Sequence, residues 1–193
     1  MHEDDGKLPL VKVIEPRVSY ADLERAPEDG RRYELYDGEA VVVPSPNLGH
    51  QDAATNIFEL LHAHARQHGG KALIAPIDIV FSEFDVLQPD VAFFRGPRRH
   101  LLRRDQPVRS APDLVVEILA PGTERTDRGR KMQAYARFGV PEYWVVDPTA
   151  MTVEVLRLSE GRFVLEQSAQ RGDTVRSATL PDLQFPATDT FAE

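Results

Sequence analysis

Apolar residues recur with a helical period in two parts of this chain. Between residues 50 and 68 they fall at Ala53, Ala54, Ile57, Leu60, Leu61 and Ala65, and Gly69-Gly70 ends the run. The segment Thr126 to Phe138 has the same period and is closed by Gly139 and Pro141. A short helix is predicted to start at Tyr20, because Ser19 is a suitable N-cap residue.

Short runs of β-branched and aromatic residues predict strands between these helices. They cover Leu73 to Phe81, Val91 to Phe94, Leu114 to Leu119 and Glu142 to Asp147. Two hairpins are predicted, one over residues 32–43 around Asp37-Gly38 and one over residues 151–167 around Glu160-Gly161. The order of elements predicts a mixed α/β fold with a partly antiparallel sheet. We expect one domain over residues 19–193, preceded by a loosely held arm over residues 1–18.

Composition and missing motifs exclude several classes of protein. The 193 residues contain no cysteine, which excludes disulfides, a thiol nucleophile and thiolate metal sites. No apolar run approaches the roughly 20 residues that span a bilayer, and the acidic N-terminus is unlike a signal peptide. We therefore expect a cytoplasmic protein without a membrane partner. Phosphate-loop, dinucleotide, serine-hydrolase and zinc-protease motifs are also missing from the sequence.

Charge is distributed unevenly along the chain. The formal net charge is −8, which argues against a general polyanion binder. Residues 91–140 nevertheless hold 11 bases and 5 acids, a local charge of +6. This stretch predicts either a localised anion-facing surface or a solvated loop in a protein that prefers arginine, and charge alone leaves both readings open.

Three acidic residues occupy positions where a strand favours apolar side chains. Glu117 lies inside an apolar strand, Asp90 follows Pro89 at the start of another, and Glu34 lies in the first hairpin. A buried carboxylate is costly unless it is paired or binds a cation. If these carboxylates converge, they form a site for a hard divalent cation. The structural alternatives are an ion pair with arginine for Glu117, a turn or cap for Asp90, and an exposed strand position for Glu34.

A lysine and several other polar residues are candidates for the same site. Lys131 lies about one turn into the helix that follows the Glu117 strand, and Tyr135 shares its face. Arg125, Arg128 and Arg130 surround the lysine in sequence. His50 is interpreted as a helix-start residue, with the rim of the site as the alternative. The remaining aromatic and histidine candidates are assigned to the core or to a solvated face: Tyr143, Trp144, His62, His64 and His68.

Several longer motifs make the chain resemble a known family. They are Gln88-Pro-Asp-Val, Pro112-Asp-Leu-Val-Val-Glu-Ile-Leu-Ala-Pro-Gly-Thr, Asp127-Arg-Gly-Arg-Lys-Met-Gln-Ala-Tyr-Ala and Gly139-Val-Pro-Glu-Tyr-Trp-Val-Val-Asp-Pro. In this order they resemble the Uma-two family of bacterial endonuclease-like domains, within the PD-(D/E)XK superfamily. The resemblance extends from about residue 20 to residue 185. It implies a restriction-endonuclease-like fold, a central mixed sheet flanked by helices, with extra β-hairpins.

The resemblance also implies roles for individual residues. Asp90 and Glu117 would be the motif acids that hold Mg²⁺ or Mn²⁺, and Glu34 would be a further acid from the N-terminal segment. The superfamily's Glu-x-Lys is absent, because residue 119 is leucine. Lys131 would supply the lysine from the following helix. Asp113, in a second Pro-Asp pair, is a rival to Asp90 for the motif aspartate.

Together these observations predict a metal-dependent endonuclease acting on nucleic acid, with DNA as the expected substrate. Asp90, Glu117 and Glu34 would hold the ion, and Lys131 supported by Tyr135 would assist catalysis. A homodimer is expected by analogy with enzymes that cut two strands. The alternatives are a nuclease-derived binding module without turnover and a hydrolase of small phosphoesters. The arginines expected to meet phosphates are Arg98, Arg99, Arg103, Arg104 and Arg128.

Overall fold

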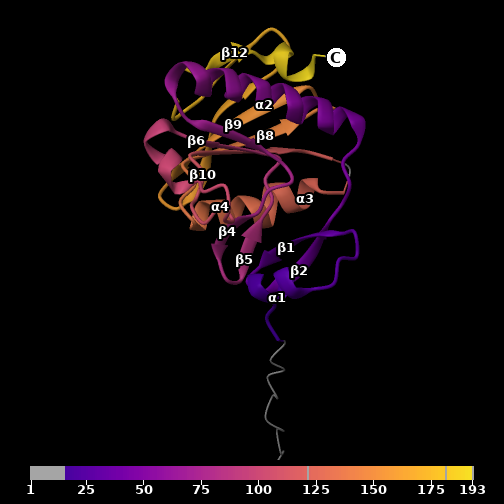
Figure 1. Cartoon of the computed structure of the whole chain (residues 1–193). Coiled ribbons are helices and arrows are strands. Elements are labelled where there is room, and N and C mark those ends of the chain that lie inside the picture. The colour runs from indigo at the N-terminus through magenta and orange to yellow at the C-terminus, as the bar shows by residue number, and fades with distance from the viewer. Residues whose placement is uncertain (1–15, 121, 181, 193) are drawn as a thin grey trace, which may run out of the picture.

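The computed structural model describes residues 16–120, 122–180 and 182–192 (Figure 1). Most of the expected N-terminal arm therefore lies outside the described residues. Within the described part of the chain, the strands form sheets of six, four and two strands. The expected mixed α/β class is confirmed, whereas the boundaries of the single domain stay a prediction.

The six-stranded sheet forms the centre of the fold, in the order β10-β9-β8-β7-β6-β3. Only β7 and β8 pair in parallel, and the other neighbours are antiparallel. All side chains of β7 are buried, since both faces of the sheet are covered at this strand. The strands are β3 (Lys71–Ile74), β6 (Val91–Phe94), β7 (Leu114–Ile118), β8 (Glu142–Asp147), β9 (Thr152–Ser159) and β10 (Arg162–Ala169).

Helices cover both faces of this sheet (Figure 1). The long helix α2 (Leu48–His68) packs Ile57 and Leu61 against Val116 and Trp144 on one face. Burial of such side chains contributes roughly 1.5–3 kcal/mol each. The other face is covered by α3 (Glu124–Thr126), a π-helical segment η2 (Asp127–Lys131) and α4 (Met132–Arg137).

A second, four-stranded sheet lies beyond α4 in the order β2-β1-β5-β4 (Figure 1). The β1–β2 turn has Asp37 and Gly38 at φ of 51° and 85°, the left-handed region that Asp-Gly turns supply. Helix α1 packs Tyr20 on this sheet and begins at a Ser19 capping box. The elements are α1 (Tyr20–Arg25), β1 (Arg32–Tyr36), β2 (Glu39–Val43), β4 (Ile79–Ser82) and β5 (Asp85–Leu87).

The C-terminal segment packs against the α2 side of the large sheet. It contains β11 (Thr174–Arg176), β12 (Gln184–Pro186) and the short 3-10 helix η3 (Ala187–Phe191). Another 3-10 helix, η1 (Gly96–Leu101), lies in the arginine-rich connection after β6. No helix among the described residues is long and apolar enough to cross a membrane.

Two sequence-based boundaries were wrong. The expected strand over residues 73–81 is instead two strands, β3 and β4, which lie in different sheets. The strand is interrupted at Ala75-Pro76. Proline lacks the amide hydrogen that a continuous strand needs. The expected helix over residues 126–138 starts at Glu124 and is π-helical from Asp127 to Lys131. Strands β5, β11 and β12 were not predicted.

Candidate active site

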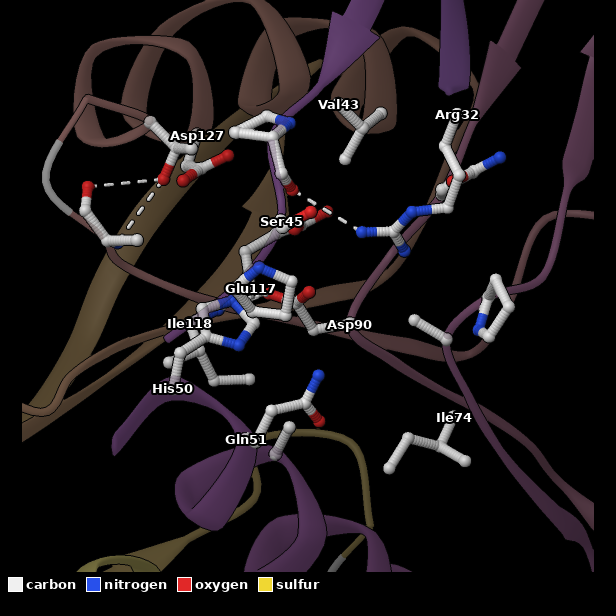
Figure 2. Close-up of a pocket in the computed structure, with 18 of the residues that line it drawn as sticks. Arg32, Val43, Ser45, His50, Gln51, Ile74, Asp90, Glu117, Ile118 and Asp127 are labelled. Atoms are coloured by element: carbon white, nitrogen blue, oxygen red, sulfur yellow. Dashed lines mark hydrogen bonds and ion pairs between the residues drawn. The ribbon is translucent and has the colours of Figure 1, made fainter. Parts of the chain in front are cut away.

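A cavity of about 280 Å³ opens where the end of β7 meets the β1–β2 hairpin and the start of α2. Figure 2 shows Asp90, Glu117 and His50 close together in this cavity, with Asp127 and Arg32 on its walls. The lining residues come from segments far apart in the sequence. The fold therefore brings the predicted acids to one place.

Glu117 lies at the closed end of the cavity and is 1% exposed. The alternation of β7 places Val115 and Glu117 toward α4, whereas Val116 and Ile118 face α2. Its Oε1 accepts a hydrogen bond from the Tyr135 hydroxyl at 2.8 Å, and its Oε2 lies 2.8 Å from Lys131 Nζ. Burial raises the pKa of the Glu117 carboxyl well above its usual value, against the lowering effect of Lys131.

Lys131 is the ammonium group at the centre of the acids. Its Nζ lies 2.8 Å from Glu117, 3.1 Å from Glu34 and 3.8 Å from Asp127. Burial alone would lower the pKa of Lys131, but the surrounding carboxylates outweigh it and raise that pKa. The lysine is therefore held in its charged form. The π-helical turn places Asp127 and Lys131 on the same side of the helix, a local irregularity that is frequent at functional sites.

Asp90 reaches the cavity from the segment between β5 and β6. Its Oδ2 accepts a hydrogen bond from the Ile118 backbone N–H at 2.8 Å, which ties this aspartate to the end of β7. His50 Nε2 lies 3.2 Å from the same oxygen. The predicted convergence of Asp90 on Glu117 is therefore present in the structure.

Glu34 is close to Lys131 but does not line the cavity. It is 3% exposed, and both of its oxygens accept hydrogen bonds. Oε2 accepts from the Tyr36 hydroxyl at 2.7 Å, and Oε1 accepts from the Gln88 backbone N–H at 2.8 Å. The alternative of an exposed strand position is wrong for this residue, because it is buried beside the lysine.

Sequence reasoning missed Asp127 as a member of the site. This residue is 3% exposed, lines the cavity and lies one helical turn before Lys131. Burial raises the pKa of Asp127 to about 6. The signal that could have found it is its i, i+4 spacing to the only lysine in the motif.

His50 occupies both of the positions considered for it. It lies in the first turn of α2, where its backbone N–H donates to the Asn47 cap, and its ring lines the cavity. The Nδ1 atom is buried and has no hydrogen-bond partner among the described residues. The expected core positions of Tyr143 and Trp144 are confirmed, since both are 0% exposed.

Charge in this site is strongly unbalanced. Asp90, Glu117 and Asp127 line the cavity and Glu34 lies behind it, so four carboxylates face the Lys131 ammonium. Their oxygens are the ligands that hard divalent cations prefer. No three acidic or histidine side chains in the described ranges form a ready-made metal cluster. The chemical type of the donors suits a divalent cation, whereas in this arrangement three of the carboxylates contact the Lys131 ammonium.

The rival aspartate, Asp113, lies outside the cavity. It is 1% exposed, and its Oδ1 lies 3.1 Å from both Arg95 and Arg98. The pair of arginines explains how a buried carboxylate is tolerated there. Asp113 therefore holds the η1 connection in place, and only Asp90 of the two aspartates faces Glu117.

The five predicted phosphate-binding arginines fall into two groups. Arg128 forms two hydrogen bonds to Glu154, at 2.6 and 3.2 Å, and Arg98 pairs with Asp113. These two guanidinium groups are already used within the protein. Arg99, Arg103 and Arg104 instead line a second cavity on the same side of the molecule as β3 and β4.

Comparisons with known proteins show what this chain is similar to. A crystal structure of a protein from Anabaena variabilis, described as a "putative nuclease", is 19% identical and superimposes with a TM-score of 0.74 over 90% of this chain and 97% of that one. An uncharacterised protein from Synechocystis is 27% identical over 128 residues, which are 64% of this chain. The aligned region spans 65% of that relative's length.

The family comparison covers almost the whole described chain. The model of the Uma2 family, described as "Putative restriction endonuclease", matches residues 19–188. This match includes all the cavity residues named above, and it agrees with the fold of the nuclease-like structure. The chain therefore belongs to the Uma2 family and has its restriction-endonuclease-like fold.

Proposed function

We propose that this protein is a divalent-metal-dependent endonuclease that hydrolyses phosphodiester bonds of nucleic acid, with DNA as its expected substrate. The observation that carries the proposal is the group of four carboxylates around one buried ammonium, facing a cavity. The "Putative restriction endonuclease" family supports the nuclease class. Metal, substrate and residue roles are our proposal.

Asp90 and Glu117 are the residues that we propose to hold Mg²⁺ or Mn²⁺. Both line the cavity, and Asp127 lies there as a further oxygen donor. Both oxygens of Glu34 already accept hydrogen bonds, from Tyr36 and Gln88, and Glu34 lies beside Lys131. We therefore propose that Glu34 orients Lys131 and contacts the metal only indirectly or through water. When bound, the ion would polarise a phosphoryl oxygen and lower the pKa of a bound water.

Lys131 has the second role in the proposed reaction. Its charged form can orient the attacking water or stabilise the negative charge that develops on the phosphoryl oxygens. The hydrogen bond from Tyr135 fixes the side chain of Glu117, and the contact with Glu34 fixes the lysine. Tyr135 therefore acts as a positioning residue, because its hydroxyl touches Glu117 and does not line the cavity.

Cleavage assays test the proposal directly. Supercoiled, linear and single-stranded DNA are incubated with Mg²⁺ or Mn²⁺ and with the wild-type protein, Glu117→Gln or Glu59→Gln. Glu59 is an exposed glutamate of α2 and serves as the matched control. We expect metal-dependent cleavage that is lost in Glu117→Gln and kept in Glu59→Gln. Equal cleavage by both variants would overturn the assignment of the site.

A nuclease-derived binding module without turnover is the second candidate function. It is favoured by the position of Lys131, which lies on a helix and is ion-paired to three acids. Magnesium titration separates the two functions. Stabilisation by the ion without cleavage of any of the three DNA forms would favour the binding module. The expected homodimer and the cytoplasmic location stay predictions.

A further inference from the structure

A second and larger cavity, of about 690 Å³, lies on another part of the surface. It is formed between the β3–β4 connection and the arginine-rich segment over residues 99–108. None of its lining residues belongs to the carboxylate cavity. This volume is within the range of small-molecule sites, about 300–1,000 Å³. It is therefore a separate candidate binding site.

The rim of this cavity is basic. Lys71, Arg99, Arg103 and Arg104 line it, and all four are exposed. Arg103 lies 3.6 Å from Asp105 in a pair in which both side chains are largely exposed, an arrangement that contributes little. Four exposed cations at one opening provide the hydrogen-bond donors and positive charge that a phosphate group requires.

The interior has a different chemistry. Leu73, Ile77, Leu102 and Val108 provide an aliphatic floor, and Tyr20 contributes to the wall. A cavity that bound inorganic anions alone would not need such an apolar surface, which suits the flat face of a nucleobase. Apart from the basic rim, the polar lining includes the Gln106 amide and one carboxylate, which is a hydrogen-bond acceptor.

Asp78 provides that acceptor. It lines the cavity, and its Oδ1 accepts a hydrogen bond from Gln88 Nε2 at 2.8 Å, which fixes its orientation. A carboxylate repels phosphate but accepts hydrogen bonds from the amino edge of a base. The cavity therefore separates an anion-binding rim from a base-binding interior.

We propose that this cavity binds a nucleoside phosphate, with the phosphate at Arg99, Arg103 and Arg104 and the base on the aliphatic floor beside Asp78. The ligand has two sources, a free mononucleotide or an unpaired nucleotide of a nucleic-acid strand. The first source is independent of the nuclease activity, whereas the second rests on the proposed function.

A third hollow connects the two cavities and makes the second source geometrically reasonable. It shares Tyr20 and Asp78 with the basic cavity, and Arg32 and Gln88 with the carboxylate cavity. Because these lining residues are shared, the third hollow lies between the other two cavities. A strand held at Asp90 could extend along it to the basic rim.

Binding measurements without metal test the proposal independently of catalysis. The dissociation constants of 5′-GMP, whose base carries an amino donor for Asp78, and of inorganic phosphate are measured by calorimetry in EDTA at low salt. The proteins are the wild type, Glu117→Gln and two triple variants. One triple variant is Arg99→Ala with Arg103→Ala and Arg104→Ala. The matched control replaces three exposed arginines elsewhere, Arg66, Arg162 and Arg171, with alanine.

We expect 5′-GMP to bind more tightly than phosphate. The cavity variant should weaken GMP binding on the order of tenfold or more, since it removes charged hydrogen-bond donors. The control variant and Glu117→Gln should bind like the wild type. Equal affinity for GMP and phosphate, no GMP binding, or an equal loss in both triple variants would overturn the proposal.

Competition identifies the source of the nucleotide. A labelled single-stranded oligodeoxynucleotide is bound to Glu117→Gln in EDTA, and 5′-GMP is added. Displacement of the oligonucleotide assigns the cavity to a nucleotide of the strand, whereas simultaneous binding of both assigns it to a free nucleotide. Absence of cleavage by the wild-type protein on every DNA form, with intact GMP binding, would reject the nuclease function and leave this site unaffected.

Discussion

Two buried glutamates lie on the adjacent parallel strands β7 and β8, and their surroundings differ completely. Glu142 is 0% exposed, and its hydrogen-bond donors among the described residues are all neutral, including Trp144 Nε1 at 2.6 Å and Thr179 Oγ1 at 2.6 Å. Further bonds come from Ser177 and from the backbone N–H groups of residues 178 and 179. Glu117 instead accepts one hydrogen bond from a hydroxyl and one from an ammonium group, and three other carboxylates lie nearby.

We interpret this difference, on the proposed function, as that between a structural carboxylate and one that serves the site. The donors around Glu142 satisfy its negative charge without an opposite charge, and they join β8 to the C-terminal segment. Glu117 faces a cavity, and its pKa is raised. The protein alone therefore stabilises the ionised carboxylate poorly. An excess of buried acid at a cavity is expected where a cation binds.

The largest expected effect is on activity, in Glu117→Gln. We expect cleavage to fall about 1,000-fold, which corresponds to about 4 kcal/mol of transition-state stabilisation. The free energy of unfolding should fall by only about 1 kcal/mol, less than in Glu142→Gln, because the Tyr135 hydroxyl can turn to accept from the new amide and Lys131 keeps its contacts with Glu34 and Asp127. Cleavage assays and urea denaturation measure the two effects. A stability loss that accounts for the lost cleavage would remove the contrast with Glu142.

The converse is expected of Glu142→Gln. The new amide group would point donors at the existing donors, so the free energy of unfolding should fall by about 3 kcal/mol. Cleavage per folded molecule should stay unchanged, because this side chain does not line the cavity. Urea denaturation together with cleavage at low temperature checks both. Normal stability in this variant would contradict the structural role.

Metal binding should stabilise the folded protein through the site that contains Glu117, and Glu142 should play no part in it. Mg²⁺ or Mn²⁺ at 100 times its dissociation constant should stabilise the protein by about 2.7 kcal/mol through mass action. The double variant Asp90→Asn with Glu117→Gln should lose this stabilisation, whereas Glu142→Gln should keep it from its lower starting point. Thermal denaturation with and without metal measures the shift. An unchanged shift in the double variant would place the ion elsewhere.

The sequence was informative about which residues are buried acids, but less so about what surrounds them. Glu117 stood out because it interrupts an apolar strand, and Lys131 because it lies about one turn into the helix that follows that strand. Glu142 stands at the start of a similar strand. Its hydrogen-bond donors, however, come from a segment more than 30 residues later, which local sequence patterns do not predict. For the same reason β11 and β12 were missed. They are three residues long, and their burial is decided by tertiary packing.

The cavity shows the same limit of sequence reasoning. Asp90 and Glu34 were found as acids near strands, but only the structure places one in the cavity and the other behind the lysine. Asp113 matched the Pro-Asp pattern equally well, and its two arginine partners assign it to the η1 connection. Sequence spacing therefore identified the candidate acids, and contacts between residues far apart in the sequence decide which of them line the cavity.

The pH dependence of stability should reveal the acidic excess. Folding raises the pKa of Asp127 from 3.8 to about 6, so its contribution is stabilising at low pH and is lost as the pH rises through about 6. In metal-free buffer the unfolding free energy should fall by about 2 kcal/mol between pH 4 and pH 7 from this group. Asp127→Asn should flatten that part of the curve. An identical curve in this variant would contradict the raised pKa.

The smallest effects come from removing one hydroxyl donor from each glutamate, through Tyr135→Phe at Glu117 and Ser177→Ala at Glu142. Each deletion should lower the free energy of unfolding by about 1 kcal/mol, because one buried hydrogen bond is lost. Only Tyr135→Phe should also lower kcat, by about tenfold, since a less fixed Glu117 holds the metal and Lys131 less well. Its cleavage should also need more Mg²⁺, a change that a purely structural tyrosine would not cause. Equal kcat in the two variants would make Tyr135 a core residue, and the distinction between the two glutamates would then rest on Lys131 alone.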